Sequence, residues 1–224
     1  ACASALSPTR SASAFLYAAS PSATTDCSTA RFACRTSSEP AALSADALSA
    51  RIIADFKNYF IRHGQAIDRN PSPGNKAGGI TTLAEKSLGA VRKAGDAPLV
   101  DAIAHGAPVA VPGGVTFIDG PGNDQVAVTA LAAAGAHLIL FTTGRGTPLG
   151  GPAPALKISS NAGLNRHKPG WIDFDAGRLI DGATMEELAD ELERLVVATA
   201  DGAATRNEQN DDRQIALWKD GVTL

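Results

Sequence analysis

The pattern of apolar and polar positions first predicts two amphipathic helices. Apolar side chains return every three or four residues from Ser44 to Phe60, and Gly64 offers a stop. The segment 184–200 has the same period, with acidic residues on its opposite face. Its apolar face holds Met185, Leu188, Leu192, Leu195 and Val196. Both segments are therefore predicted to pack one face against a core.

A third helix is predicted from a capping signal. Thr82 followed three residues later by Glu85 is the sequence of a capping box, and it opens a helix that runs to about Lys93. The preceding stretch, 70–79, contains two prolines and three glycines and is predicted to be an irregular loop. A short helical piece is predicted at 98–105.

Strands and a helix alternate in the second half of the chain. The segments 114–119, 137–142 and 155–160 are predicted strands, and 123–135 is a predicted helix between the first two. Such short connections favour parallel pairing and right-handed crossovers. The end of the chain, from 213, is predicted to be a late strand ending in a turn. The predicted fold class is α/β, with a mostly parallel, Rossmann-like sheet flanked by helices.

Charge and composition exclude several classes of protein. The 224 residues carry a formal net charge of −3, which argues against a protein that neutralises the phosphates of a nucleic acid. No apolar run approaches the roughly 20 residues that cross a bilayer, so no membrane contact is expected. All three cysteines, Cys2, Cys27 and Cys34, precede residue 39. Because the rest has none, no disulfide framework supports the fold, and a reducing, cytoplasmic setting is expected.

The first part of the chain differs from everything after it. Ala, Ser and Thr fill 24 of the first 38 positions, and Asp26 is the only acidic residue there. Three explanations stay open: a disordered leader, a transit-like peptide, or a segment foreign to the fold, such as the product of a shifted reading frame. Residues 1–40 are predicted to be a low-complexity leader outside the fold, and 41–224 an α/β domain.

Two polar, glycine-rich loops follow the two clearest strands. They read "DGPGND" at 119–124 and "TTGRGTPLGG" at 142–151. Parallel sheets bind ligands beyond the carboxyl ends of their strands. If 114–119 and 137–142 are neighbouring strands, both loops face one crevice.

The loop at 142–151 has the chemistry of an anion site. Gly144 and Gly146 let backbone N–H groups approach a ligand, and Arg145 supplies a planar fork suited to a carboxylate or phosphate. Hydroxyl groups come from Thr142, Thr143 and Thr147. The alternative reading is a tight turn after a strand.

The loop at 119–124 offers oxygen ligands. Asp119 and Asp124 bring carboxylates and Asn123 brings an amide, which could accept hydrogen bonds from sugar hydroxyls or coordinate a hard divalent cation. The positive end of the predicted helix at 123–135 points toward the same place. The alternatives are a simple turn and, for Asp124, a helix cap.

The loop at 70–79 is the third candidate. Asn70, Ser72 and Asn75 are compact polar groups, and Lys76 is an electrostatic anchor or, if desolvated, a base. The alternative is a solvated loop lysine. Lys86, on the capped helix, is predicted to be a surface residue. The chain has no Walker motif, no dinucleotide fingerprint and no GxSxG elbow.

These loops also carry a resemblance to a known family. "NPSPGNKAGGITTLAEKSLG", "DGPGND", "LFTTGRGTPLG", "HKPGWIDFDAG" and the closing "KDGVTL" resemble the altronate/galactarate dehydratases over roughly 41–224. The match corresponds to that family's carboxyl-terminal portion, and "WIDFDAG" and "GVTL" look closer to the altronate members. Family enzymes carry a small amino-terminal domain and further catalytic sequence before this region, and residues 1–38 match neither.

The resemblance implies a hydro-lyase of hexuronate and sugar-acid catabolism that converts a sugar acid to a 2-keto-3-deoxy acid with Fe²⁺ or Mn²⁺. Arg145 and the surrounding backbone amides would bind the substrate carboxylate, and Lys76 would be the base. Asp119 and Asp124 would coordinate a metal ion, and Asp124 would also be a catalytic residue. The expected substrate contacts come from Asn70, Ser72, Asn75, Asn123, Thr142, Thr143, Gly144, Gly146 and Thr147.

The expected partners are a small sugar acid and either a second copy of the chain or a separate amino-terminal subunit. The alternatives are a non-catalytic sugar-acid binding module and a subunit that works only with a partner chain.

Overall fold

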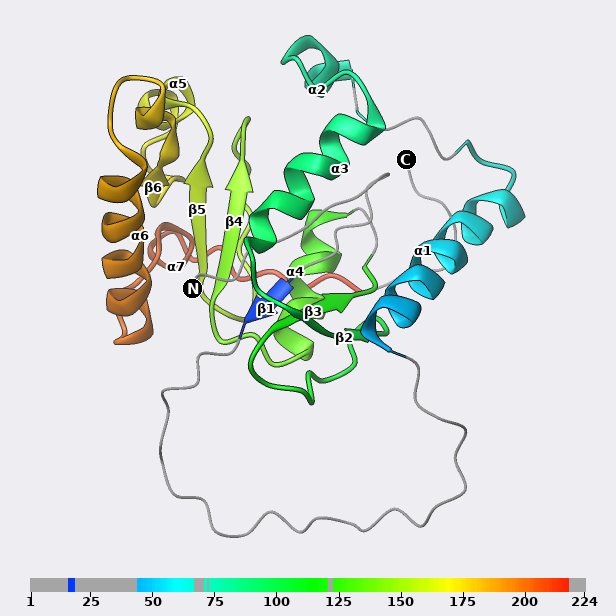
Figure 1. Cartoon of the computed structure of the whole chain (residues 1–224). Helices are drawn as coiled ribbons and strands as arrows, with labels where there is room; N and C mark the ends of the chain where they lie inside the picture. Colours follow the sequence, from blue (N-terminus) through cyan, green and yellow to red (C-terminus); the bar gives the residue numbers. More distant parts are fainter. Residues whose placement is uncertain (1–15, 19–43, 67–70, 72, 121–122, 218–224) are drawn as a thin grey trace, which may run out of the picture.

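The computed structural model describes residues 16–18, 44–66, 71, 73–120 and 123–217 (Figure 1). The fold is α/β, with parallel strands flanked by helices, as the alternation of strands and helices predicted. The strands form two sheets of three strands each. Within the described part of the chain, no helix is both long and apolar enough to cross a membrane.

The first sheet has the order β1-β3-β2. β2 (Leu99–Ile103) and β3 (Val115–Ile118) are parallel, and β1 (Leu16–Ala18) pairs with β3 in the antiparallel sense. The helix predicted at 98–105 is therefore wrong, because pairing with β3 and burial of Ala102 override the local preference of this short segment. Three residues of the predicted leader thus lie against β3; the boundary at residue 40 stays a prediction.

The second sheet has the order β4-β5-β6 and is parallel throughout. β4 (Ile139–Thr143) and β5 (Ala155–Ser159) match two predicted strands, whereas the two-residue β6 (Phe174–Asp175) was not predicted. β3 and β4 belong to different sheets. The premise that these two strands are neighbours in one sheet is therefore wrong.

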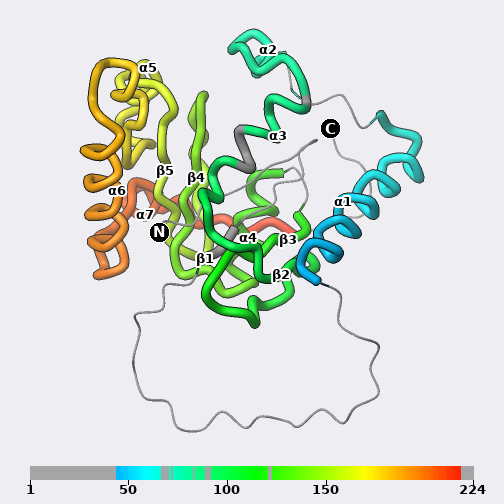
Figure 2. Tube along the Cα trace, viewed as in Figure 1, coloured from blue at the N-terminus to red at the C-terminus, as the bar shows by residue number. Residues whose placement is uncertain are grey.

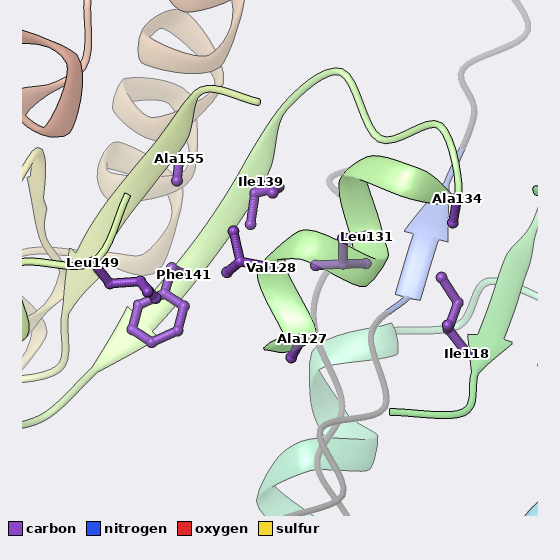
Figure 3. Close-up of a cluster of buried hydrophobic side chains, with 9 residues drawn as sticks. All are labelled: Ile118, Ala127, Val128, Leu131, Ala134, Ile139, Phe141, Leu149 and Ala155. Atoms are coloured by element: carbon purple, nitrogen blue, oxygen red, sulfur yellow. The ribbon is translucent and has the colours of Figure 1, made fainter. Parts of the chain in front are cut away.

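A helix lies between the two sheets and joins them into one core. α4 (Asp124–Ala133) begins after the N-cap residue Asn123, whose side chain accepts hydrogen bonds from the backbone of Gln125 and Val126. Its apolar residues meet β3 on one side and β4 on the other (Figure 3). The shared core consists of Ile118, Ala127, Val128, Leu131, Ala134, Ile139, Phe141, Leu149 and Ala155. α4 is accordingly apolar almost all round, as a helix buried on both sides must be.

The outer face of the second sheet is covered by α6 (Met185–Ala200) (Figure 1). Leu188 packs with Ile158 and Phe174, and Leu192 and Leu195 lie against this cluster. The helix opens with a capping box formed by Thr184 and Glu187. Met185, predicted on the apolar face, is instead 69% exposed because it lies in the first turn, beyond the edge of the cluster.

Three more helices precede β2 in the chain. α1 (Ala45–Arg62) packs on β2, with Phe60 buried. α3 (Leu83–Val91) begins at the predicted capping box: Glu85 Oε2 accepts the backbone N–H of Thr82, and Thr82 Oγ1 accepts that of Glu85. α2 (Pro73–Ala77) was predicted to be a loop. Its first residue is a proline, which suits the start of a helix and explains why the proline count misled the prediction.

Short elements complete the carboxyl-terminal half, and the trace in Figure 2 shows how the chain reaches them. α5 (Ala162–His167) follows β5, the 3₁₀ helix η3 (Ala176–Leu179) follows β6, and α7 (Arg206–Gln209) follows α6. Residues 213–217 form no strand, so the predicted late strand is wrong over this part, and its remainder lies outside the described residues.

Gly177, in η3, packs closely against the start of α5. A Cβ at this position would overlap backbone atoms of Asn161 and Ala162. We expect Gly177→Ala to lower the free energy of unfolding by about 2–3 kcal/mol, because backbone atoms cannot move aside cheaply. Urea denaturation measures this change. Gly170→Ala is the matched control, since nothing lies within 4 Å of its Cβ; an equal loss in both variants would contradict the packing described here.

Candidate functional site

The arginine of the "TTGRGTPLGG" loop lies directly against α2. A Cβ on Gly74 would overlap Arg145 Nη1 and would stand 3.1 Å from Arg145 Cζ. Only a residue without a side chain allows this approach. The structure therefore brings together two of the three predicted loops, which are about 70 residues apart in sequence, and the Arg145 side chain remains exposed to solvent beside them.

Residues 144–147, here called the Arg145 loop, are held by hydrogen bonds at several backbone positions. Thr143 Oγ1 accepts the N–H of Gly146 at 3.0 Å, and the carbonyl of Gly144 accepts from Asn161 Nδ2 at 3.0 Å. Gly146 has φ +75° and lies close to Leu164, where a Cβ would stand 2.9 Å from Cδ1. Glycine is thus required at position 146 for two reasons: the positive φ and the lack of space for a side chain.

A lysine also reaches the end of the same strand. Lys93, in the 3₁₀ helix η2 (Arg92–Ala94), donates from Nζ to Thr142 Oγ1 at 2.7 Å. Thr142 precedes Arg145 by three residues, so an ammonium and a guanidinium both lie at the carboxyl end of β4. Desolvation lowers the pKa of Lys93, and the charge of Lys86 lowers it further.

Lys86 and Asp124 extend this cluster toward α4. Lys86 is half-buried on α3, and desolvation lowers its pKa, which the charge of Asp124 partly raises again. Asp124, the first residue of α4, is open to solvent on one side, yet the protein around its carboxyl group excludes enough water to raise its pKa. The prediction that Lys86 is a plain surface residue is wrong, since its side chain is half-buried and lies within the electrostatic influence of Asp124.

Asp119 lies in a different electrostatic setting from Asp124. It follows β3, and desolvation raises its pKa, which the charge of His105 lowers and that of Asp55 raises. His105 follows β2 and Asp55 lies on α1, so the charges that act on Asp119 come from the side of α1. The structure thus brings Asp124, but not Asp119, toward the lysines.

The other predicted ligand residues fall into three groups. Thr147, in the Arg145 loop, and Asn75, in α2, are half-buried, whereas Lys76 is exposed in the last turn of α2. The Asn123 side-chain oxygen serves as the cap of α4. Asn70 and Ser72 lie outside the described residues.

A metal site is not evident in the described part of the chain. No group of three or more His, Cys, Asp or Glu side chains there is arranged to hold a metal ion. Asp119 and Asp124, the two predicted ligands, have different surroundings, and Asp124 faces a lysine. The residues described do not fit a metal site, so metal dependence stays a prediction.

Sequence reasoning missed the two lysines for an identifiable reason. Lys86 and Lys93 are seven residues apart, and this spacing places them on one face of a continuous helix. That signal was present in the sequence. The sequence did not show where α3 and η2 lie in the fold, with Lys93 against Thr142 of β4 and Lys86 near Asp124 of α4.

Comparison with known proteins gives a consistent set of relatives. The family model described as D-galactarate/Altronate dehydratase, C-terminal, matches residues 35–223. The chain is 53% identical over 173 residues to the altronate dehydratase of Escherichia coli (strain K12), covering 77% of this chain and 35% of that protein. Identity to the altronate dehydratase of Bacillus subtilis (strain 168) is 48% over 174 residues, with the same coverage of both chains.

A third relative has a different name. The chain is 32% identical over 175 residues to the (2R)-sulfolactate sulfo-lyase subunit beta of Chromohalobacter salexigens, covering 73% of this chain and 45% of that protein. The matched part of this chain therefore spans less than half the length of each of these three relatives.

Gly74 allows a direct test of the contact with α2. Gly74→Ala would push aside the end of a flexible arginine side chain, so we expect the free energy of unfolding to change by less than about 1 kcal/mol. The affinity for a sugar acid should fall at least ten-fold, as measured by calorimetry, because the guanidinium is displaced. Gly78→Ala is the control, since its Cβ would make ordinary contacts at 3.5 Å. Equal affinity in the two variants would separate α2 from the site.

Proposed function

Because the chain belongs to the D-galactarate/altronate dehydratase family, we propose that it supplies catalytic groups for removing water from a sugar acid. The substrate would be altronate or galactarate, and the product a 2-keto-3-deoxy acid. The observation that carries this proposal is the arrangement at the end of β4. There Arg145 meets α2, and Thr142 meets Lys93.

The chemistry requires three groups. A base must take the proton from C2, next to the carboxylate, and positive charge must stabilise the enediolate that forms. An acid must protonate the departing hydroxyl at C3. The enol that remains then tautomerises: C3 takes up a proton and the C2 hydroxyl loses one, which gives the 2-keto group. We assign the substrate carboxylate to Arg145, because a guanidinium binds a carboxylate through two parallel hydrogen bonds.

Lys93 is the best candidate for the base. A lysine acts as a base only when its amine is neutral, and burial together with the charge of Lys86 favours that form. The hydrogen bond with Thr142 orients its amine at the same strand end as Arg145. We therefore assign to Lys93 the role that the sequence suggested for Lys76, whose side chain is exposed.

Lys86 and Asp124 suit the other two roles. The ammonium of Lys86 would stabilise the negative charge of the enediolate. Desolvation raises the pKa of Asp124, which favours the protonated carboxyl that could donate a proton to the departing hydroxyl. No step is assigned to a metal ion.

The sulfo-lyase relative supports placing carboxylate recognition in this chain. Sulfolactate and the sugar acids share a carboxylate beside a carbon that bears a hydroxyl group, whereas sulfite and water are different leaving groups. Similarity that extends across both reactions is best explained if the shared segment binds the shared end of the substrate, as the Arg145 loop would.

A second candidate function is favoured by the name of one relative. The sulfo-lyase relative is named as a subunit. The chain would then be a sugar-acid binding module or a catalytic subunit that requires a partner chain. A cytoplasmic location and association into homo-oligomers remain predictions.

Activity measurements separate these functions. The purified chain is incubated with altronate or galactarate, with and without Fe²⁺ or Mn²⁺, and the 2-keto-3-deoxy acid is measured. We expect product either from the chain alone or after addition of the remaining two-thirds of the Escherichia coli enzyme. Binding without product in either case would leave only the binding module. Neither binding nor product would remove the proposed function.

The lysine pair predicts a specific pH dependence. kcat/KM should rise with pH as Lys93 loses its proton, with a midpoint below the usual lysine pKa of about 10.4. In Lys86→Gln the neighbouring positive charge is gone, so the pKa of Lys93 rises and the midpoint moves to higher pH. Lys86→Arg keeps the charge and should keep the midpoint. A midpoint that stays the same in Lys86→Gln would show that Lys93 is not the titrating base.

A further inference from the structure

A lysine outside the cluster just described is buried beneath the Arg145 loop. Lys157, on β5, has an exposed fraction of 0%, and its Nζ donates a hydrogen bond to the backbone carbonyl of Thr147. Thr147 is the last residue of the Arg145 loop, two residues from Arg145. The contact therefore joins the middle of the second sheet to the end of the candidate binding loop.

Two carboxylates accompany this lysine. Asp173 lies just before β6, and its Oδ2 accepts the backbone N–H of Lys157 at 2.7 Å, while its Oδ1 accepts that of Arg206 at 2.8 Å. Asp212, which follows α7, raises the pKa of Lys157 through its charge, as does Asp173. Desolvation is the largest effect, however, and the resulting pKa of Lys157 is about 8.

A gain in folding stability is a poor explanation for the burial of Lys157. Desolvating an ammonium group costs several kcal/mol, and replacing buried ionic groups by apolar residues of similar size is often neutral or stabilising. The lysine has a specific polar contact instead, and that contact is a carbonyl of the loop that carries Arg145.

We propose that Lys157 is a positioning residue for substrate binding, which fixes the far end of the Arg145 loop so that the guanidinium is held for the substrate carboxylate. This role rests on the proposed function of the loop. It completes the anchoring of the segment, because the near end is already tied by Thr143 and Asn161. Without Lys157, Thr147 loses its hydrogen bond to β5.

The residues that follow the Arg145 loop are held by other contacts. A Cβ on Gly150 would overlap the backbone carbonyl of Asp212, and Asn207 holds the nearby chain by donating from Nδ2 to the carbonyl of Ala155 at 2.9 Å. Loss of the Lys157 ammonium should therefore loosen the Arg145 loop while the rest of the sheet remains packed.

The same geometry makes the loop sensitive to pH. The charged groups that face Lys157 are Asp173 and Asp212, with Arg206 next to Asp173. As the pH rises through about 8, Lys157 loses its charge in the folded protein and its hydrogen bond to Thr147 weakens. In the unfolded chain the lysine keeps its proton to about pH 10.4. Between these values the unfolded state binds more protons, so this group makes stability rise with pH even as the loop loosens.

Hydrogen exchange of Lys157→Met tests the positioning role in the whole chain. Methionine keeps the length of the side chain and removes the donor. We expect the amides of residues 144–147 and 149 to exchange at least ten-fold faster, and the affinity for altronate to fall by a similar factor, while exchange elsewhere in β4 and β5 stays the same. Leu156→Val is the control, because it weakens packing on the same strand and leaves the Lys157 contact intact.

Three results would overturn the role of Lys157. They are unchanged exchange at 144–147 and 149, an increase spread evenly over the second sheet, and the same local increase in Leu156→Val. If the wild-type chain binds no sugar acid, the proposed function fails, but the exchange pattern still decides whether Lys157 positions the loop.

A pH titration of the unmodified lysine gives a second measurement that needs no Lys157 variant. Trp171 lies beside the loop, with Cε3 3.7 Å from the Cβ position of Gly146, so its fluorescence reports loop movement. In a Trp218→Phe background, the fluorescence of Trp171 should change with a midpoint near pH 8. A flat profile between about pH 7 and 9.5 would contradict the role of Lys157, whether or not Lys157→Met folds.

Discussion

The candidate site depends on a guanidinium that lies against a backbone without a side chain. Arg145 can reach α2 only because position 74 is a glycine, and the loop can make its turn beside Leu164 only because position 146 is another. Neither contact is strong by itself. Their effect is geometric: they place a fixed cation, still open to solvent, at the end of β4. The lysine cluster, the buried lysine below the loop and the acid at the start of α4 all derive their proposed roles from that position.

Several positively charged groups lie together at the end of β4, where a turn of neutral residues would have had a lower electrostatic free energy. Lys93 reaches the same strand end through Thr142, and the charge of Lys86 lowers the pKa of Lys93. Bringing like charges together in a partly desolvated place disfavours both charged forms. A bound carboxylate would offset that cost, and an enediolate would offset it more, because its charge develops where these groups already lie. This is the physical reason for preferring an elimination site over a simple loop.

Much of the fold followed from the sequence, and the failures have local causes. Apolar periodicity located α1, α4 and α6, and the Thr82–Glu85 pair located α3, because these signals depend on neighbours within one turn. The division into two sheets could not be read in this way. β3 and β4 are separated by α4 in space as well as in sequence, and its all-round apolar surface satisfies both sheets at once. β2 was mistaken for a helix because its strand character comes from pairing with β3.

The candidate site was predicted in part, because only some of its residues lie in segments of unusual composition. The Arg145 loop and the "NPSPGNKAGG" segment have unusual compositions, and the structure brings them together at Gly74. Lys86, Lys93 and Lys157 have ordinary local sequences, and only the packing of α3 and β5 gives them chemical interest.

The most direct test compares altronate with altritol, the alditol that lacks its carboxylate. Calorimetry on the chain and on Arg145→Lys measures both affinities. If the guanidinium holds the carboxylate, altronate should bind, altritol should bind at least ten-fold more weakly, and Arg145→Lys should remove most of this difference, because a point charge cannot form the paired hydrogen bonds. Equal affinity for the two ligands, or a preference for altronate that Arg145→Lys leaves intact, would show that the end of β4 does not bind the acid.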